Sequence, residues 1–246
     1  MKIPLYLFLI ISLVPINSFG ETFAIEREKN NKIIIKTEDL TVTVNSCSRF
    51  RITTKFAAYT LGAYNRMATV VTEKITVAKD DENVKRIELS SKPFSVKDNT
   101  RKFNLSLEVR KNLPGILFIE SEVFNLSEYP SDCYFSWSIP LHSIMYVTED
   151  GDTVISTSKR EEISENWLFF PETDSKGGFG IIVNSKNIVM RYHNTNSWLI
   201  QGNIPKTAEF KSIEKGQSNK INFTFLSVQT EKEVKKYHTI LKSDNQ

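Results

Sequence analysis

Alternation of apolar and polar side chains is the feature that most constrains the fold of this chain. Between residues 103 and 109, apolar side chains occupy every odd position and polar side chains every even position, and residues 221–225 repeat the pattern. Successive side chains of a β-strand point to opposite faces of a sheet, so such runs predict half-buried antiparallel strands. In residues 117–122, Leu117, Ile119 and Ser121 share one face, with Glu120 and Glu122 on the other.

Further strands are expected along most of the chain. They lie at residues 23–28, 32–36, 40–44, 50–54, 70–77, 84–89, 133–138, 144–148, 180–184, 188–192, 197–200 and 207–213. Leu113-Pro114-Gly115 is a turn signal between two alternating runs, because proline presets φ and glycine accepts a positive φ. The sequence therefore predicts an all-β fold, a large two-sheet antiparallel β-sandwich that forms one domain over residues 21–241.

One short helix is expected at the C-terminal end. Thr230 and Glu233 have the spacing of a capping box. The side chains that then fall on one face at helical spacing are Val234, Tyr237, His238 and Leu241. This face should pack on the sandwich or on a protein partner, and residues 242–246 form a polar tail.

The first twenty residues have the pattern of a signal peptide. Lys2 precedes a short apolar run, and Ser18 and Gly20 are the small residues before a cut at Glu21. This predicts a secreted or periplasmic protein, and no other apolar stretch is long enough for a membrane span. The net charge is only +3 over 246 residues, which argues against a nucleic-acid partner.

The two cysteines, Cys47 and Cys133, leave two interpretations open. They form a disulfide, which an oxidising compartment permits, or they are two separate buried thiols. With only three scattered histidines they do not make a zinc pattern, so we expect neither a metal nor another cofactor.

No strong catalytic motif is present, and we assign no catalytic residue. Glu120 and Glu122 have about the spacing that glycoside hydrolysis needs, but a solvated outer strand face is the favoured interpretation. An enzyme would require His142 or His193 to meet a carboxylate such as Glu172 in a cleft.

The aromatic residues suggest a ligand site. Residues 156–174 are predicted to form a long loop that carries Trp167, and Trp198 follows an asparagine-rich turn. Flat aromatic rings can stack on the C–H face of a sugar, while neighbouring polar groups bind its hydroxyls. The candidate ligand-binding residues are Trp167, Trp198, His193, Arg191, Glu172 and Asp174. The alternative is that these rings fill the core, as Trp137 is expected to do.

The chain also resembles a known superfamily. A strand, the turn Lys215-Gly216-Gln217 and an alternating aromatic strand up to Phe225 are similar to the closing strands of galactose-mutarotase-like supersandwich domains. The hairpin over residues 105–125 resembles the central sheet of that superfamily, and a helix after the last strand is also similar. Such sandwiches also occur as accessory domains of glycoside hydrolases. Lys215 and Gln217 stand where the family commonly has proline and glutamate, and this departure favours a domain that only binds, or that serves as a scaffold.

We therefore expect a secreted carbohydrate-binding or carbohydrate-processing accessory β-sandwich. One alternative is a sugar epimerase, hydrolase or lyase of the same fold. Another is a structural or interaction protein that docks a partner through the C-terminal helix.

Overall fold

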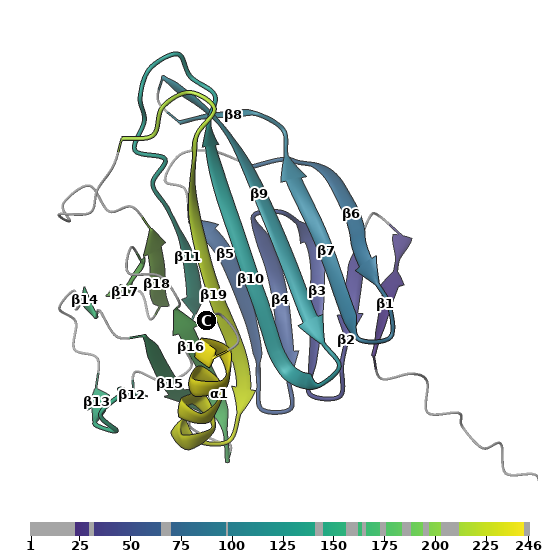
Figure 1. Cartoon of the computed structure of the whole chain (residues 1–246), viewed down its shortest axis with the longest axis vertical. Helices are drawn as coiled ribbons and strands as arrows, with labels where there is room; N and C mark the ends of the chain where they lie inside the picture. Colours follow the sequence, from purple (N-terminus) through teal and green to yellow (C-terminus); the bar gives the residue numbers. More distant parts are fainter. Residues whose placement is uncertain are drawn as a thin grey trace, which may run out of the picture.

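The computed structural model describes residues 23–29, 32–64, 70–96, 98–140, 145–155, 162–163, 166–172, 176–183, 188–193, 197–202 and 212–243. Within these ranges the strands form two antiparallel sheets that lie face to face, and a helix packs on the second sheet (Figure 1). The predicted fold class, an all-β two-sheet sandwich with one short C-terminal helix, is confirmed.

The first sheet has nine strands, and its first five follow one another as a meander. Its order is β1-β2-β3-β4-β5-β11-β18-β17-β14. The bounds are β1 (Ala24–Arg27), β2 (Ile33–Lys36), β3 (Leu40–Ser46), β4 (Arg49–Thr54), β5 (Ala58–Tyr64), β11 (Phe135–Pro140), β18 (Ser197–Gly202), β17 (Ile188–His193) and β14 (Glu162–Ile163).

The second sheet has ten strands, and the last strand of the chain lies near its middle. Its order is β13-β12-β15-β16-β19-β10-β9-β7-β6, with β8 paired to β9. The bounds are β13 (Thr153–Ile155), β12 (Met145–Val147), β15 (Trp167–Pro171), β16 (Gly178–Val183), β19 (Ser218–Val228), β10 (Leu113–Asn125), β9 (Asn99–Arg110), β7 (Val84–Ser91), β6 (Thr72–Asp80) and β8 (Phe94–Val96). β19 pairs with β10 on one side and with β16 on the other, antiparallel to both.

Alternate side chains of the strands fill the space between the two sheets. On β9, Phe103, Leu105, Leu107 and Val109 are buried, whereas the polar residues between them are half-buried, as the pattern predicts. The alternation ends where both faces of a strand are covered. Every residue of β19 from Phe223 to Val228 is buried, because the helix packs on the outer side of this strand.

Aromatic side chains join the two sheets in the core. Trp137 of β11 is buried, and its ring centroid lies 6.0 Å from that of Phe103 on β9. The indole N–H of Trp137 donates to Oγ of Ser121 on β10 at 2.9 Å, so the buried donor is satisfied. Tyr59 of β5 packs against Phe179 of β16, with ring centroids 4.6 Å apart.

Several segments differ from the expectation, among them the expected turn at residues 113–115, which belongs to β10. Residues 156–174 are not a continuous loop, because β14 and β15 fall within them. The alternation of apolar and polar residues does not indicate β15, because Trp167 to Phe170 are all buried. Their side chains pack alternately in the core between the sheets and in the cluster under the helix, so the strand has no polar face. β5 is not among the expected strands: Tyr59 and Leu61 alternate with Thr60 and Gly62, but glycine and alanine are unfavourable in strands. Most of the strand expected at 207–213 lies outside the described residues.

The helix α1 (Glu231–Ser243) follows β19 closely and folds back onto the sheet. Val234 and Leu241 are its buried residues, as the helical spacing predicts. The Glu233 carboxylate accepts a hydrogen bond from the backbone N–H of Gln229 at 2.6 Å, which satisfies a donor just before the helix. Across the described ranges, no helix has both the length and the apolar character of a membrane span.

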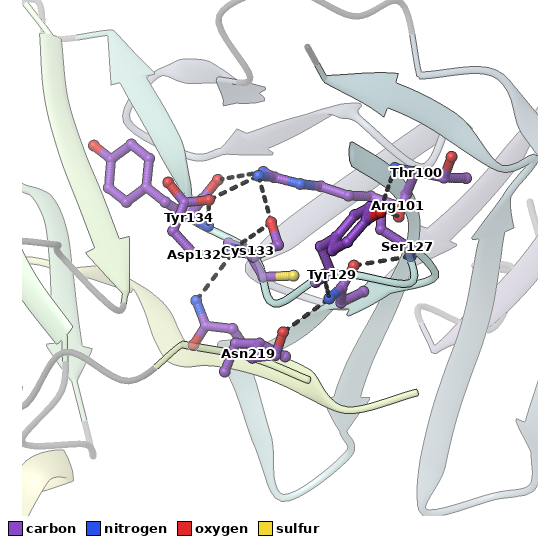
Figure 2. A network of polar contacts seen from close by, with 11 residues as sticks. Thr100, Arg101, Ser127, Tyr129, Asp132, Cys133, Tyr134 and Asn219 are labelled. Carbon is purple, nitrogen blue, oxygen red and sulfur yellow. Dashed lines mark hydrogen bonds and ion pairs between the residues drawn. The ribbon is translucent and has the colours of Figure 1, made fainter. Parts of the chain in front are cut away.

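A buried polar network fixes the segment between β10 and β11 (Figure 2). Arg101 of β9 is only 4% exposed, and its guanidinium donates to Asp132 at 2.7 Å and to Ser131 Oγ at 2.9 Å. The side-chain amide of Asn125 donates to the Tyr129 carbonyl at 2.8 Å. Side-chain hydrogen bonds therefore hold this connection in place where sheet pairing is sparse.

Candidate functional site

The outer face of the ten-stranded sheet has a covered half and an open half. α1 contacts β15, β16 and β19 and lies over them (Figure 1). The sheet residues in the apolar cluster with α1 are Ile116, Val147, Trp167, Phe169, Ile182, Leu226 and Val228. The open half is formed by β6, β7, β9, β10 and the first part of β19, and it presents polar side chains.

A glycine sets how closely α1 approaches the sheet. A Cβ atom added to Gly180 of β16 would lie 2.6 Å from Cγ2 of Val234 on the helix. This is far inside van der Waals contact, so a larger residue would push the helix outward. The position of the helix matters for the open half, because Leu241 borders it.

The open half contains two adjoining pockets, which together we call the polar groove. The far pocket, of about 360 Å³, is lined by β6, β7, β9 and β10. The helix-side pocket, of about 370 Å³, reaches across β19 to Leu241 of α1. Arg86, Ser106 and Glu120 line both pockets. Both volumes lie in the range of small-molecule sites.

Strand register builds the floor of the polar groove from rows of side chains that cross β7, β9, β10 and β19. The middle row is Glu88, Ser106, Glu120 and Asn222. The flanking rows are Ser90, Asn104, Glu122 and Lys220, and Arg86, Glu108, Phe118 and Thr224. Hydroxyls, amides, carboxylates and cations therefore alternate over a rigid sheet surface.

Opposite charges pair along the β7 and β9 side of the groove. Arg86 lies 3.1 Å from Glu88 and 3.8 Å from Glu108, and Arg110 lies 2.8 Å from Glu108, measured between nitrogen and oxygen atoms. The Arg110 guanidinium also stands over the ring of Phe118, 4.4 Å from its centroid. One face of that ring is thus occupied by a cation.

The two glutamates of β10 share one cation. Lys220 of β19 lies 3.8 Å from Glu120 and 3.6 Å from Glu122. Glu122 also accepts a hydrogen bond from the Ser218 hydroxyl. The expected carboxylate pair is therefore held together by a neighbouring strand, on the half-buried outer face of β10.

Two groove residues each have a buried polar atom without a hydrogen bond. Among the described residues, neither Nε of Arg86 nor Oδ1 of Asn104 has a hydrogen-bond partner, although both atoms are buried. One is a donor and the other an acceptor, and both residues line the far pocket. Because both atoms are covered, a ligand hydroxyl would reach them only if these side chains moved.

The structure places Trp167 in the apolar cluster beneath α1. This residue is 3% exposed and belongs to β15 rather than to a loop, so its ring fills the core between sheet and helix. Glu172 follows β15 and accepts a hydrogen bond from the Tyr59 hydroxyl at 2.6 Å, which ties it to the first sheet. Burial, and then this hydrogen bond, raise the pKa of Tyr59. Asp174 lies outside the described residues.

For the other three candidate ligand-binding residues, the structure describes only the position of the backbone. Arg191 pairs with Leu199, and His193 pairs with Ser197, between β17 and β18. Trp198 of β18 pairs with Ile139 of β11. The side chains of Arg191, His193 and Trp198 are outside what the structure describes. These strands belong to the nine-stranded sheet, whereas Trp167 belongs to the ten-stranded one.

Cys47 and Cys133 are two separate buried thiols, one of the two interpretations that the sequence leaves open. Burial raises the pKa of both thiols. Cys133 has a φ of 42°, a left-handed conformation that is uncommon for residues other than glycine. Within the described ranges, no three His, Cys, Asp or Glu side chains are grouped to hold a metal ion.

The sequence does not indicate that the residues of the polar groove contact a ligand. The available signal was the polar face of each alternating run, which carries Asn104, Ser106, Glu120 and Asn222. A polar strand face usually marks exposure to solvent, so it does not by itself indicate a site. Only the register shows that these faces adjoin.

Comparison with known proteins finds similarity in structure but not in sequence. No protein-family model matches the chain, and no curated protein matches it. A TPR-domain containing protein from Parabacteroides distasonis superimposes with a TM-score of 0.55 and 10% identity, over 81% of this chain and 47% of that one.

Two further solved structures are named for sugar enzymes. A galactose mutarotase related enzyme from Lactobacillus acidophilus superimposes with a TM-score of 0.50 and 7% identity, over 81% of this chain and 98% of that one. The GH36 alpha-galactosidase AgaB from Geobacillus stearothermophilus gives a TM-score of 0.51 and 6% identity, over 84% of this chain and 41% of that one. At these identities the likeness concerns architecture alone, and this chain has the galactose-mutarotase-like β-sandwich fold.

Proposed function

We propose that the protein binds carbohydrate in the polar groove and holds it without cleaving it. The observation that carries this proposal is the floor of side-chain rows, in which hydroxyl, amide and carboxylate groups stand beside the apolar Phe118 and Leu241. Sugar hydroxyls both donate and accept hydrogen bonds, and the C–H face of a sugar ring is apolar. The groove offers partners of both kinds on rigid strands.

The fold neighbours add support of a weaker kind. Two of them are named as a galactose mutarotase related enzyme and an alpha-galactosidase. A single fold hosts many functions, so this association raises the expectation of a sugar ligand but does not assign one. The groove itself carries the proposal.

The geometry of the glutamate pair favours binding over hydrolysis. Glu120 and Glu122 are two residues apart on β10, which corresponds to roughly 7 Å along a strand. Glycosidases use similar separations, but their two carboxyl groups flank the scissile bond. Both glutamates here project from the same floor, and both contact Lys220.

A glycan-binding array probed with the purified protein tests the proposal. We expect Glu120→Gln and Asn222→Ala to weaken binding, because each removes a polar group of the middle row. Glu128→Gln is the matched control, since Glu128 is an exposed glutamate that also pairs with a lysine, Lys215. Trp198→Ala tests the site that the sequence suggests.

Each result of the array has a definite meaning. Loss of binding in both groove variants, with the control unaffected and all variants folded, supports the groove. Loss in Trp198→Ala alone would move the site to the nine-stranded sheet. Silence over the whole array would contradict carbohydrate binding and favour a protein partner. A bound sugar that changes its linkage or anomeric ratio by NMR would replace binding with catalysis.

Export is the second part of the proposal. The proposal of export depends on the signal-peptide pattern of residues 1–20, which lie outside the described residues. An exported protein would be secreted or periplasmic. The mass of the protein recovered from the periplasm or medium checks this. We expect a new N-terminus at Glu21, and an intact Met1 in the cytoplasmic fraction alone would contradict export.

A further inference from the structure

We infer that the ligand is a neutral oligosaccharide that lies across both pockets, with a glycosidic linkage over Ser106 and Glu120. This inference deepens the proposed function and depends on it. It concerns the length and the charge of the ligand, which the proposed function leaves open.

The length follows from how the pockets adjoin. The far pocket and the helix-side pocket share Arg86, Ser106 and Glu120. A ligand that fills both pockets must therefore pass over these three residues. Together they extend from β6 to β19, which are separated by β7, β9 and β10. Four strand spacings correspond to roughly 19 Å. This is well beyond one pyranose ring, so the groove suits linked rings that run across the strands.

The two pockets differ in what they offer a sugar ring. The helix-side pocket includes the apolar Phe118 and Leu241, together with the Asn222 amide. The far pocket includes the polar side chains of Thr76, Ser90 and Asn104, and none of its lining residues is aromatic. Rings in the two pockets therefore meet different surfaces, and removing the amide of one pocket should leave the other pocket intact.

The charge balance argues for a neutral ligand. Lys74, Arg86 and Arg110 line the two pockets together with four carboxylates. Lys220 lies beside this floor, so cations and carboxylates are equal in number. Arg86 and Arg110 are engaged by glutamates, and Lys220 is shared between Glu120 and Glu122. A uronic acid or a sulfated sugar would meet these carboxylates without a surplus of cations to balance its charge. Hydroxyl groups meet no such repulsion.

Isothermal titration calorimetry with sugars of increasing length tests the inference. The probes are glucose, galactose and mannose, their neutral homo-oligomers up to the pentamer, and galacturonic acid oligomers of equal length. We expect affinity in one neutral series to rise by roughly tenfold or more from the single sugar to the trimer, as the second pocket fills. Affinity for galacturonate oligomers should be lower, and affinity for the neutral series should change little with added salt.

Two asparagine variants assign the pockets. Asn104→Ala removes an amide from the far pocket, and Asn222→Ala removes one from the helix-side pocket. We expect each to weaken oligomer binding by roughly tenfold. Only one of them should weaken binding of the single sugar. Asn45→Ala, on an exposed position of β3 in the other sheet, is the matched control and should change nothing.

The outcomes separate this inference from the proposed function. A single sugar that binds as tightly as its oligomers would overturn the inference and leave carbohydrate binding in place. Tighter binding of galacturonate oligomers, weakening with salt, would overturn the neutral ligand. Binding of none of these sugars, with none on the glycan array, would overturn both proposals.

Discussion

Arg101 is a cation that the fold buries almost completely, and its partners explain how this is tolerated. The guanidinium donates to Asp132, to Ser131 and, at 3.4 Å, to the Tyr134 carbonyl. Asp132 is itself 40% exposed at its side chain, so the ion pair joins the interior to solvent. The carboxylate also accepts from the Tyr134 N–H at 3.3 Å, which shapes the turn around Cys133.

Replacing Asp132 by alanine should destabilise the protein by about 1–3 kcal/mol, because Arg101 then keeps its charge without a counterion. The lower part of this range is expected, since solvent reaches the carboxylate. Asp132→Asn keeps an acceptor and should lose less. Urea unfolding of these variants beside Glu128→Ala, which removes an exposed partner of Lys215, measures the difference. Equal stability of Asp132→Ala and the wild type would contradict this role.

Arg101 also shows where prediction from single residues fails. It has the same parity on β9 as Phe103, Leu105 and Val109, so the alternation places it on the inward face. A charged residue at the end of such a run normally indicates that the strand leaves the core at that point. Its burial depends on Asp132, about thirty residues later, and no local pattern indicates that contact.

Among the elements, α1 illustrates both the strength and the limit of the pattern. Its apolar face at Val234 and Leu241 was predictable because helical spacing is a local property. β15 was not predictable, because its outer face is buried by α1 itself. A strand covered on both sides loses its alternation, and the cover lies some sixty residues later in the chain.

Gly180→Ala should destabilise the protein by about 1–3 kcal/mol, because the added methyl group overlaps Val234 and forces α1 away from the sheet. Combining it with Val234→Ala should relieve the overlap, so the double variant loses less stability than the sum of the two single losses. Denaturant unfolding of all four proteins measures this coupling.

Gly62→Ala provides the control for the glycine substitution. Gly62 also lies in a strand, but a Cβ atom there would meet no atom within 4 Å. Its effect should therefore be small. Additive losses in the Gly180 and Val234 cycle would show that the close approach does not limit the helix position.

His238 should make the docking of α1 sensitive to acid. Burial lowers its pKa from the ordinary value of 6.5, Lys242 lowers it further, and Glu149 opposes the shift. The folded state disfavours the charged imidazole. The contribution of His238 to the free energy of unfolding is therefore full above pH 6.5 and is lost as the pH falls through the lowered pKa. Melting temperatures of wild type and His238→Gln at neutral and mildly acidic pH check this, and a parallel decline in both would exclude His238 as the cause.

On the scale of the whole molecule, the fold class was predictable and the polar groove was not. Period-two alternation fixes which residues face inward, and this suffices for a two-sheet sandwich. The groove depends on which strands are neighbours and on their register, so that Ser106 stands beside Glu88 and Glu120. Alternation constrains register only to a shift of two residues, and it does not specify strand order.

The state of the two cysteines is a property of the whole core. Cys47 and Cys133 are both fully buried in the cluster between the sheets, as free thiols with pKa values raised by burial. We expect no reaction of the native protein with a thiol reagent at neutral pH and two reactive thiols per chain after unfolding. A reductant should leave the melting temperature unchanged, whereas an unfolded protein without reactive thiols would indicate a disulfide.

The central place of β19 has a consequence for how the chain acquires its fold. The strand is the last to leave the ribosome among the described strands, yet β10 and β16 meet only through it. Until it arrives, both halves of the sheet expose an unpaired edge, which invites pairing with other chains. Assembly of this sheet must therefore wait for the synthesis of β19 and proceed through contacts that are distant in sequence, which makes it slow. Until β19 is made, the chain is therefore exposed to mispairing with its neighbours.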